Sequence, residues 1–286
     1  MPRKLLIVSG PTGVGKTDWA IGLARQYASP VISCDSRQIY REMRIGTAVP
    51  DASQLAAVKH YFIQTISVTE DYTAGRYETD ALALIDSLFA AGHETLVMCG
   101  GSGFYIDAVC RGLDNIPDAD PELRRQLNER IDREGVESLW MDLRRLDPEA
   151  YATIDLANRA RVLRAVEVCL LSGRTFSSFK LQAPKQRDFD IEKIVLTRPR
   201  EELYARIDRR VLQMMEDGLL DEVRALLPYR HCTALQTVGY KELFAYLDGA
   251  LPLEEAVRQI QSNTRRYARK QLTWWRRDPA VRWVEL

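Results

Sequence analysis

Cysteine and histidine are scarce in this sequence, and neither is spaced as a disulfide framework or a metal site requires. Among 286 residues there are 5 Cys and 3 His, with no Cys-x-x-Cys pair. An odd cysteine count argues against a framework in which every thiol is paired. His231 and Cys232 are neighbours, but two adjacent side chains rarely bind one zinc ion alone. We therefore expect neither a disulfide framework nor structural zinc.

Long hydrophobic runs and an excess of one charge are also missing. The apolar runs are far shorter than the roughly 18 residues that span a bilayer, and residues 1–4 lead into a strand-like segment without a signal-peptide core. Lys and Arg number 40, as do Asp and Glu, so a nucleic-acid surface must come from local clustering of charge. We expect a cytoplasmic protein that has no membrane segment and is a monomer.

Short apolar runs alternate with helical patterns in the first part of the chain. Strands are predicted over residues 4–9, 31–34, 61–65 and 95–99, and helices follow residue 17, cover 73–91 and follow residue 103. This alternation predicts an α/β fold with a parallel sheet flanked by helices.

The pattern then becomes purely helical, with Asp-Pro-Glu caps at Asp120 and Asp147 and a helix from about Asn158 to Gly173. Strand character returns over 191–197, helices follow from residue 200, and a strand-like tail covers 281–284. We predict a core of residues 1–112 and 188–286, interrupted by an all-helical insertion domain of residues 113–187.

The segment GPTGVGKT matches the phosphate-binding pattern G-x-x-x-x-G-K-[ST] in full, between a predicted strand and helix. Its glycines allow backbone N–H groups to surround an anion at the helix N-terminus. Lys16 supplies a charge to the terminal phosphate, and the Thr17 hydroxyl is a candidate ligand of Mg²⁺. The pattern predicts a di- or triphosphate bound by Gly10, Pro11, Thr12, Gly13, Val14, Gly15, Lys16 and Thr17.

The candidate catalytic acid follows the second strand, in CDSRQIY at 34–40. A P-loop nucleotide hydrolase places an acid after a later strand, but here that strand leads into CGGSGFY, without a carboxylate. At the carboxyl edge of a parallel sheet, Asp35 would lie beside the phosphates and act on an acceptor group. A helix cap is the alternative role for Asp35. Ser102, in a glycine turn at the same edge, is a second candidate, unless this turn only connects strand and helix.

Basic residues cluster near the end of the sequence. Seven Lys or Arg and no acid occur between Arg258 and Arg277, with Tyr267, Trp274 and Trp275 among them. This is the pattern of a polyanion-binding surface, and the aromatics are candidates to stack on bases. The alternative is that Trp274 belongs to the core and the arginines are merely solvated. Smaller basic groups are Arg206, Arg209 and Arg210, and Arg159, Arg161 and Arg164.

Together these features resemble one family, the tRNA dimethylallyltransferases, also called tRNA isopentenyltransferases. The matching motifs occur in order over nearly the whole sequence. They are GPTGVGKT at 10–17, DSRQIYREMRIGTA at 35–48, GGSGFY at 100–105, ADPELR at 119–124, RARVLRAVEV at 159–168, ARIDRRV at 205–211, VGYKEL at 238–243 and RRYARKQLTWWRR at 265–277.

The resemblance implies a P-loop NTPase-like core that transfers the dimethylallyl group from dimethylallyl diphosphate to N6 of an adenosine. In that family the adenosine is the one 3′ to the anticodon, so the partner is the tRNA anticodon stem-loop. Asp35 would be the general base, and Ser36 and Gln38 would hold the extruded base. The P-loop, Lys16 and Arg210 would bind the departing diphosphate, with Mg²⁺ on Thr17, and Ser102 would support the amine or the phosphate.

The resemblance also implies a set of tRNA contacts. They are Asp35, Ser36, Arg37, Gln38, Ser102, Arg124, Ala160, Arg161, Val162, Leu163, Arg164 and Arg269. The sequence shows neither the longer tail of some relatives nor the zinc-finger extension of eukaryotic ones, which fits a bacterial-type enzyme.

Three other functions remain to be separated from this one. An adenylate isopentenyltransferase performs the same chemistry on a free nucleotide, but needs neither a helical insertion nor a basic C-terminal helix. A small-molecule P-loop kinase would transfer phosphate and would not depend on dimethylallyl diphosphate. A non-catalytic RNA-binding module leaves Lys16 and Asp35 without a role.

Overall fold

The computed structural model describes residues 3–114, 116–179 and 184–286. The chain divides into two compact units, Met1–Arg111 with Gln186–Leu286, and Gly112–Lys185. The first is called the core unit below and the second the insertion unit. The boundaries predicted from the sequence were 112/113 and 187/188; residues 115 and 180–183 of the predicted insertion lie outside the described residues.

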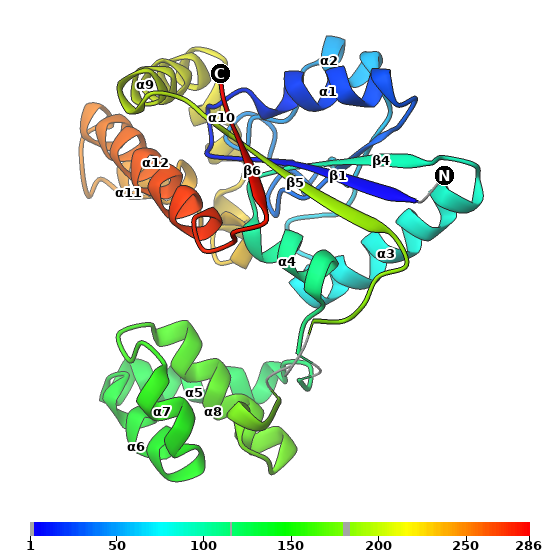
Figure 1. Ribbon diagram of the computed structural model, residues 1–286. Coiled ribbons are helices and arrows are strands. Elements are labelled where there is room, and N and C mark those ends of the chain that lie inside the picture. The colour runs from blue at the N-terminus through cyan, green and yellow to red at the C-terminus, as the bar shows by residue number, and fades with distance from the viewer. Residues whose placement is uncertain (1–2, 115, 180–183) are drawn as a thin grey trace. The chain divides into compact units, whose positions relative to one another are not determined.

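The core unit is built on a six-stranded sheet of order β3-β2-β4-β1-β5-β6 (Figure 1). All of its strand pairs are parallel. The strands are β1 (Lys4–Ser9), β2 (Val31–Ser33), β3 (His60–Tyr61), β4 (Thr95–Cys99), β5 (Asp190–Thr197) and β6 (Val281–Glu285). The predicted fold class, a parallel sheet flanked by helices, is confirmed.

Successive residues of the central strands bury their side chains on opposite faces of the sheet, as strand geometry requires. Leu5 and Ile7 belong to one hydrophobic cluster and Val8 to another. In Figure 1, α1 (Lys16–Gln26) covers one face, and α3 (Ala74–Ala90) and α4 (Gly103–Arg111) cover the other. Because both faces are covered, these strands read as continuous apolar runs in the sequence.

The register of the sheet brings several loop starts together. Ser9 of β1 pairs with Val195 of β5, and Cys99 of β4 lies opposite both Val8 and Ser33. The segments that follow β1, β2, β4 and β5 therefore leave the sheet at one edge, the carboxyl edge where parallel sheets bind ligands.

The C-terminal helices pack around a hydrophobic cluster of their own. They are α9 (Arg200–Glu216), α10 (Leu219–Ala225), α11 (Tyr240–Leu247) and α12 (Leu253–Trp275), with short turns η2 (Leu227–Tyr229) and η3 (Thr233–Leu235). Their cluster includes Val211, Leu219, Tyr240 and Ile260, and it also buries Ile39 and Met43 from the segment after β2. This shared cluster fixes the segment after β2 against the C-terminal helices.

The insertion unit is helical throughout its described part. It contains α5 (Pro121–Glu134), α6 (Glu137–Leu146), α7 (Pro148–Thr153), α8 (Arg159–Ser172) and the short turn η1 (Phe176–Phe179). The predicted caps form: Asp120 accepts a hydrogen bond from the Leu123 amide, Asp147 from Ala150 and Asn158 from Arg161. Its cluster of apolar side chains is separate from those of the core unit.

Two of the arginines predicted to contact tRNA are engaged inside this unit. Glu167 is fully buried, and it forms ion pairs with Arg124 at 2.7 Å and Arg164 at 2.6 Å. Arg164 also donates to the Pro117 carbonyl. Charges taken out of water need such pairing, so Arg124 and Arg164 have a structural role independent of RNA.

Two other residues of the predicted tRNA-contact set have buried side chains. Val162 is 0% exposed and Leu163 is 6% exposed, and both lie in the core of the insertion unit. A side chain with almost no accessible surface cannot contact a polyanion. Ala160 and Arg161 on the same helix are exposed.

The segment after β2 differs from its prediction in two places. The predicted strand at 61–65 ends at Tyr61, because Phe62 and Gln64 have positive φ values of 59° and 51°, which no strand accommodates. An additional helix, α2 (Ala52–Ala57), begins at Asp51 with a capping box formed with Gln54. The spacing Asp-x-x-Gln is the sequence signal for this start.

Within the described residues, every helix is too short or too polar to cross a bilayer.

We expect Glu167→Gln to destabilise the insertion unit by about 3 kcal/mol, because it leaves two arginines around a buried site without a counter-charge. Chemical denaturation followed by circular dichroism measures the change. Glu122→Gln is the control, because Glu122 pairs with Arg125 on the exposed surface of α5, where ion pairs contribute little. Equal stability of the two variants would contradict the structural role assigned to Glu167.

Candidate active site

The P-loop links β1 to α1 in a conformation that depends on glycine. Gly10 has a φ of 143°, and a Cβ atom there would lie 2.5 Å from the Leu196 carbonyl oxygen of β5. Gly15 has a φ of 108° and stands at the start of α1 in the left-handed region. Only glycine adopts both geometries without strain, so the sequence fixes the loop against the sheet and the helix N-terminus.

Two arginines that lie more than 180 residues after the loop in the sequence form hydrogen bonds to it. Arg198, just after β5, donates to the Val14 carbonyl at 2.9 Å, and Arg206 on α9 donates to the Gly13 carbonyl at 2.8 Å. These bonds hold the loop in shape and add positive charge beside it, which favours an anionic ligand.

Lys16 and Thr17 carry the groups that the pattern assigned to phosphate and metal. The Lys16 ammonium donates to the carbonyl oxygens of Gly10 (3.0 Å) and Pro11 (2.8 Å). Burial lowers the pKa of Lys16, while Cys99 and Asp35 act in the opposite direction. A phosphate oxygen is a better partner for this desolvated cation than neutral carbonyls. The Thr17 hydroxyl forms no hydrogen bond within the described residues, so it is available to a ligand.

Asp35 lies across the site from the loop, in the segment after β2. Its Oδ1 accepts hydrogen bonds from the amides of Arg37 at 2.8 Å and Gln38 at 3.3 Å. The alternative role as a helix cap is not realised, because a turn and not a helix follows Asp35, but Oδ1 stabilises that turn. In the described part of the chain, Oδ2 has no hydrogen-bond partner, and it remains free to accept a proton.

Ser36 and Ser102 bond to each other. The Ser36 amide donates to the Ser102 hydroxyl oxygen at 3.0 Å, and that hydroxyl donates to Ser36 Oγ at 3.2 Å. Ser102 is absent from the linings of the cavities described below. It therefore ties the turn after β4 to the segment after β2, and it fixes the position of Ser36.

The Gln38 side chain is oriented by two backbone carbonyls. Its Nε2 donates to Thr47 at 3.1 Å and to Ala48 at 2.9 Å. Both amide hydrogens are thus used, and the carbonyl oxygen Oε1 is the group that Gln38 can offer to a ligand.

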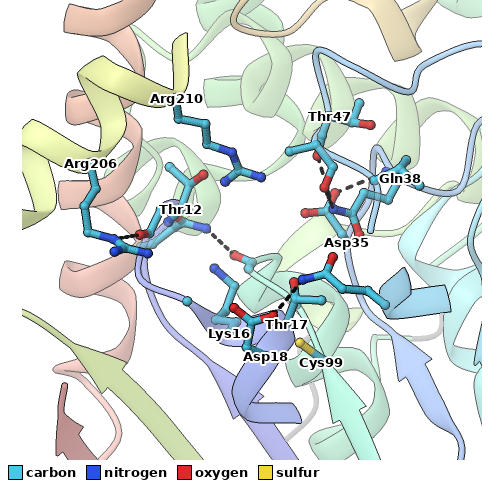
Figure 2. Close-up of a pocket in the computed structure, with 18 of the residues that line it drawn as sticks. Thr12, Lys16, Thr17, Asp18, Asp35, Gln38, Thr47, Cys99, Arg206 and Arg210 are labelled. Atoms are coloured by element: carbon cyan, nitrogen blue, oxygen red, sulfur yellow. Dashed lines mark hydrogen bonds between the residues drawn. The ribbon is translucent and has the colours of Figure 1, made fainter. Parts of the chain in front are cut away.

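Arg210 on α9 completes the polar centre. Figure 2 shows the side chains of Lys16, Asp35 and Arg210 directed toward the same space. Burial lowers the pKa of Arg210, and the Asp35 carboxylate opposes that shift. Arg210 is half-buried and makes no hydrogen bond to any described residue, so its guanidinium is available to an anion.

Two cavities share this centre. The larger, about 540 Å³, is lined by the P-loop, Gln38, Arg206 and the turn after β4. The smaller, about 220 Å³, is lined by Ser36, Arg37 and apolar side chains such as Met214 and Ile260. Both include Thr12, Thr47, Ala48, Asp35, Arg210 and Tyr267 in their walls. The arrangement can therefore hold a diphosphate in one cavity, with a carboxylate where the two cavities meet.

A family model described as IPP transferase matches residues 38–278. The chain belongs to the IPP transferase family. The family predicted from the sequence motifs is thereby confirmed.

Relatives with this family's activity in their names match this chain over nearly its full length. A tRNA dimethylallyltransferase of Bacteroides thetaiotaomicron is 50% identical over 279 residues, which are 98% of this chain and 90% of the relative. The crystal structure of the tRNA isopentenylpyrophosphate transferase from Bacillus halodurans has a TM-score of 0.72 and 38% identity, and the match covers 99% of this chain and 90% of that one. A eukaryotic dimethylallyltransferase acting on tRNA shares the fold, with a TM-score of 0.84 at 23% identity over 99% of this chain and 74% of that one.

Gln271 is a residue of this IPP transferase whose position the sequence reasoning missed. Its Oε1 accepts a hydrogen bond from the Thr12 amide, and its Nε2 donates to the Gly101 carbonyl, both at 2.9 Å. Gln271 is 6% exposed, and a side chain at Gly101 would collide with it. One amide from α12 therefore joins the P-loop to the turn after β4. The signal in the sequence is a polar residue on the buried stripe of a basic helix.

The aromatic residues of α12 have different roles from one another. Trp275 is 1% exposed and packs in the core of the sheet, so its predicted stacking on a base is wrong. Trp274 packs against Gly103 at the start of α4 and lies over Arg277, which agrees with the core alternative. Tyr267 is 43% exposed and lines both cavities, so it alone of the three can stack on a ligand there.

Other predicted contacts of this IPP transferase lie outside the two cavities. Arg269 is exposed on α12 and donates to the Tyr204 hydroxyl at 3.4 Å. Arg124 and residues 160–164 belong to the insertion unit, whereas the residues that line the two cavities belong to the core unit.

We expect Gln271→Met to raise the Kd for inorganic pyrophosphate by up to about thirtyfold, because two hydrogen bonds that shape the P-loop are lost at about 1 kcal/mol each. Isothermal titration calorimetry measures this affinity. Gln261→Met on the same helix is the matched control, because among the described residues the Gln261 side chain donates to the Asp208 carbonyl alone. If both variants bind pyrophosphate like the wild type, the bridge does not shape the site.

Proposed function

We propose that this chain transfers the dimethylallyl group from dimethylallyl diphosphate to N6 of the adenosine 3′ to the anticodon of tRNA. The observation that carries the proposal is the meeting of a phosphate-binding loop, the half-buried cation of Arg210 and a carboxylate with one free oxygen, Asp35, at the junction of two cavities. The relatives at up to 52% identity that are named tRNA dimethylallyltransferase support the same reaction.

The diphosphate belongs in the larger cavity. The P-loop amides, Lys16 and Arg210 surround the space in which its oxygens would lie. When the C1–O bond of the donor breaks, negative charge collects on the diphosphate, and fixed positive groups in a desolvated site stabilise that charge. Lys16 then exchanges its loop carbonyls for phosphate oxygens.

Asp35 is the proposed general base. The N6 amine attacks C1 of the dimethylallyl group, so the N6–C1 bond forms as the C1–O bond breaks, and N6 acquires positive charge. Oδ2 of Asp35 accepts the N6 proton, while Oδ1 stays bonded to the amides of Arg37 and Gln38. Removing the proton relieves the charge that develops on nitrogen.

The adenine would be held by groups at the same junction. Gln38 offers Oε1, and Tyr267 offers an exposed ring for stacking. Ser36 lines the smaller cavity, with its hydroxyl fixed by Ser102. A base drawn out of the anticodon loop must lose its stacking partners, and an aromatic ring replaces part of that energy.

Mg²⁺ fits the donors that are present. Magnesium in phosphate sites is bound by few protein oxygens together with phosphate oxygens and water, and the Thr17 hydroxyl is such an oxygen. When bound, the ion neutralises charge on the diphosphate.

The tRNA would lie over exposed basic side chains. On α12 these include Arg266, Arg269 and Lys270. In the insertion unit, taken by itself, Arg161 is exposed, and so is its neighbour Ala160. Arg124 is 42% exposed at its side chain, so it remains a candidate contact beside its structural role. With such a substrate we expect the reaction to take place in the cytoplasm.

The decisive experiment supplies labelled dimethylallyl diphosphate with Mg²⁺ and either unmodified tRNA or AMP. We expect label in tRNA at the adenosine 3′ to the anticodon, located by nuclease digestion and mass spectrometry, and no label when EDTA removes the metal. Label in AMP alone would assign the free-nucleotide activity. Absence of transfer to both acceptors, with phosphoryl transfer from ATP, would assign a kinase.

Asp35→Ala should lower single-turnover transfer at least about a hundredfold, the usual contribution of a general base, while the Kd for tRNA changes little. Rapid-quench kinetics and filter binding measure the two quantities. Loss of tRNA binding with intact single-turnover chemistry would refute the assignment of Asp35 as base.

A further inference from the structure

A carboxylate from α10 organises the loop that lines both cavities. Glu222 Oε2 accepts hydrogen bonds from the amides of Arg44 (3.0 Å) and Ile45 (2.7 Å), and Oε1 accepts from the Gly46 amide at 3.0 Å. Three consecutive amides on one carboxylate fix the backbone of residues 44–46, since charge-assisted bonds of this kind are the strong ones.

Tyr240 contacts both Glu222 and the 44–46 loop. Its hydroxyl donates to Glu222 Oε1 at 2.6 Å, and the ring is 0% exposed. A Cβ atom at Gly46 would lie 2.7 Å from the Tyr240 ring, so the loop rests directly on the ring. The motifs RIGTA and VGYKEL, which the catalytic groups leave without a role, meet at this contact.

The fixed loop continues into the residues that orient Gln38. The carbonyls of Thr47 and Ala48 accept both hydrogens of the Gln38 amide, and Ala48 has a positive φ of 50°. A non-glycine residue keeps such a conformation only where its surroundings over-determine it. On the N-terminal side of that loop Glu222 accepts three amides, in addition to the turn's own bonds from the Ala48 amide to Ile45 and from the Val49 amide to Arg44. Loss of the carboxylate therefore weakens the fixed position of the two carbonyls.

We propose that Glu222 is a positioning residue that sets base selection: through residues 44–48 it fixes the amide of Gln38 so that Oε1 faces the substrate. Oε1 and the Asp35 carboxylate are both acceptors. Together they accept the two hydrogens of an exocyclic amine, whereas a base with a carbonyl at that position would face two acceptors and be rejected. The inference rests on the proposed function, because it concerns the base that receives the dimethylallyl group.

The test compares two anticodon stem-loops that differ only in having adenosine or inosine at the target position. We expect the wild type to bind the adenosine form at least about tenfold more tightly, since an unpaired buried acceptor is costly. Glu222→Gln should reduce this ratio to about threefold or less and lower kcat/KM for tRNA about tenfold. Its Kd for pyrophosphate should stay within about twofold of the wild type.

Glu78→Gln is the matched control. Glu78 is a buried carboxylate of the same unit, 8% exposed and paired with Arg187, so its loss tests stability alone. It should lower Tm without changing the adenosine-to-inosine ratio. Gln38→Met combined with Glu222→Gln should lose no more discrimination than Gln38→Met, because both act through one amide.

Tyr240→Phe serves if Glu222→Gln fails to fold, because it removes one donor to Glu222 and keeps the three amides. It should reduce the ratio in the same direction by a smaller factor. A wild type that transfers the dimethylallyl group, together with a folded Glu222 or Tyr240 variant that keeps the full ratio, overturns this inference alone. A wild type without transfer to tRNA overturns the proposed function and this inference together.

Discussion

The site depends on the parallel pairing of β1 with β4 on one side and β5 on the other. Together with the parallel pairing of β4 with β2, it brings the P-loop, the Asp35 segment, the turn at Gly100 and Arg198 to one edge, although they are far apart in the sequence. A shift of one residue in β1 would turn its buried side chains to the opposite faces. The two hydrophobic clusters that hold the sheet between its helices therefore also hold the chemistry in register.

Two of the groups that act by charge, Lys16 and Asp35, were predictable from the sequence, because they lie close after strands. Lys16 and Asp35 follow β1 and β2 within a few residues, and the parallel sheet places such residues together. Gln271 and Glu222 were not predictable in this way. They reach the P-loop and the 44–46 loop from helices more than 170 residues further along the chain, and no local pattern encodes such a contact.

The burial of Val162, Leu163 and Trp275 was not expected, because in each helix the buried residues alternate in the sequence with charged residues of the exposed face. Val162 and Leu163 lie between arginines, and Trp275 lies among Lys and Arg, yet all three are in hydrophobic clusters. Trp275 is four residues from Gln271 and seven from Ala268, which are also buried, and this is the helical spacing of one face. The spacing of Ala268, Gln271 and Trp275 is therefore the sequence signal that Trp275 is buried and that Gln271 is an interior polar residue.

The helix α12 is one continuous body of 23 residues, about 34 Å long at 1.5 Å per residue. Ile260 anchors it in the C-terminal cluster, Gln271 bonds it to the P-loop, and Trp275 anchors it in the sheet. Its outer face carries Arg266, Arg269 and Lys270 in solvent. The outer face of α12 is thus suited to a polyanion, while its inner face shapes the P-loop through Gln271. Because both faces belong to one helix, a change in the position of α12 would alter both the surface for the polyanion and the site for the small molecule.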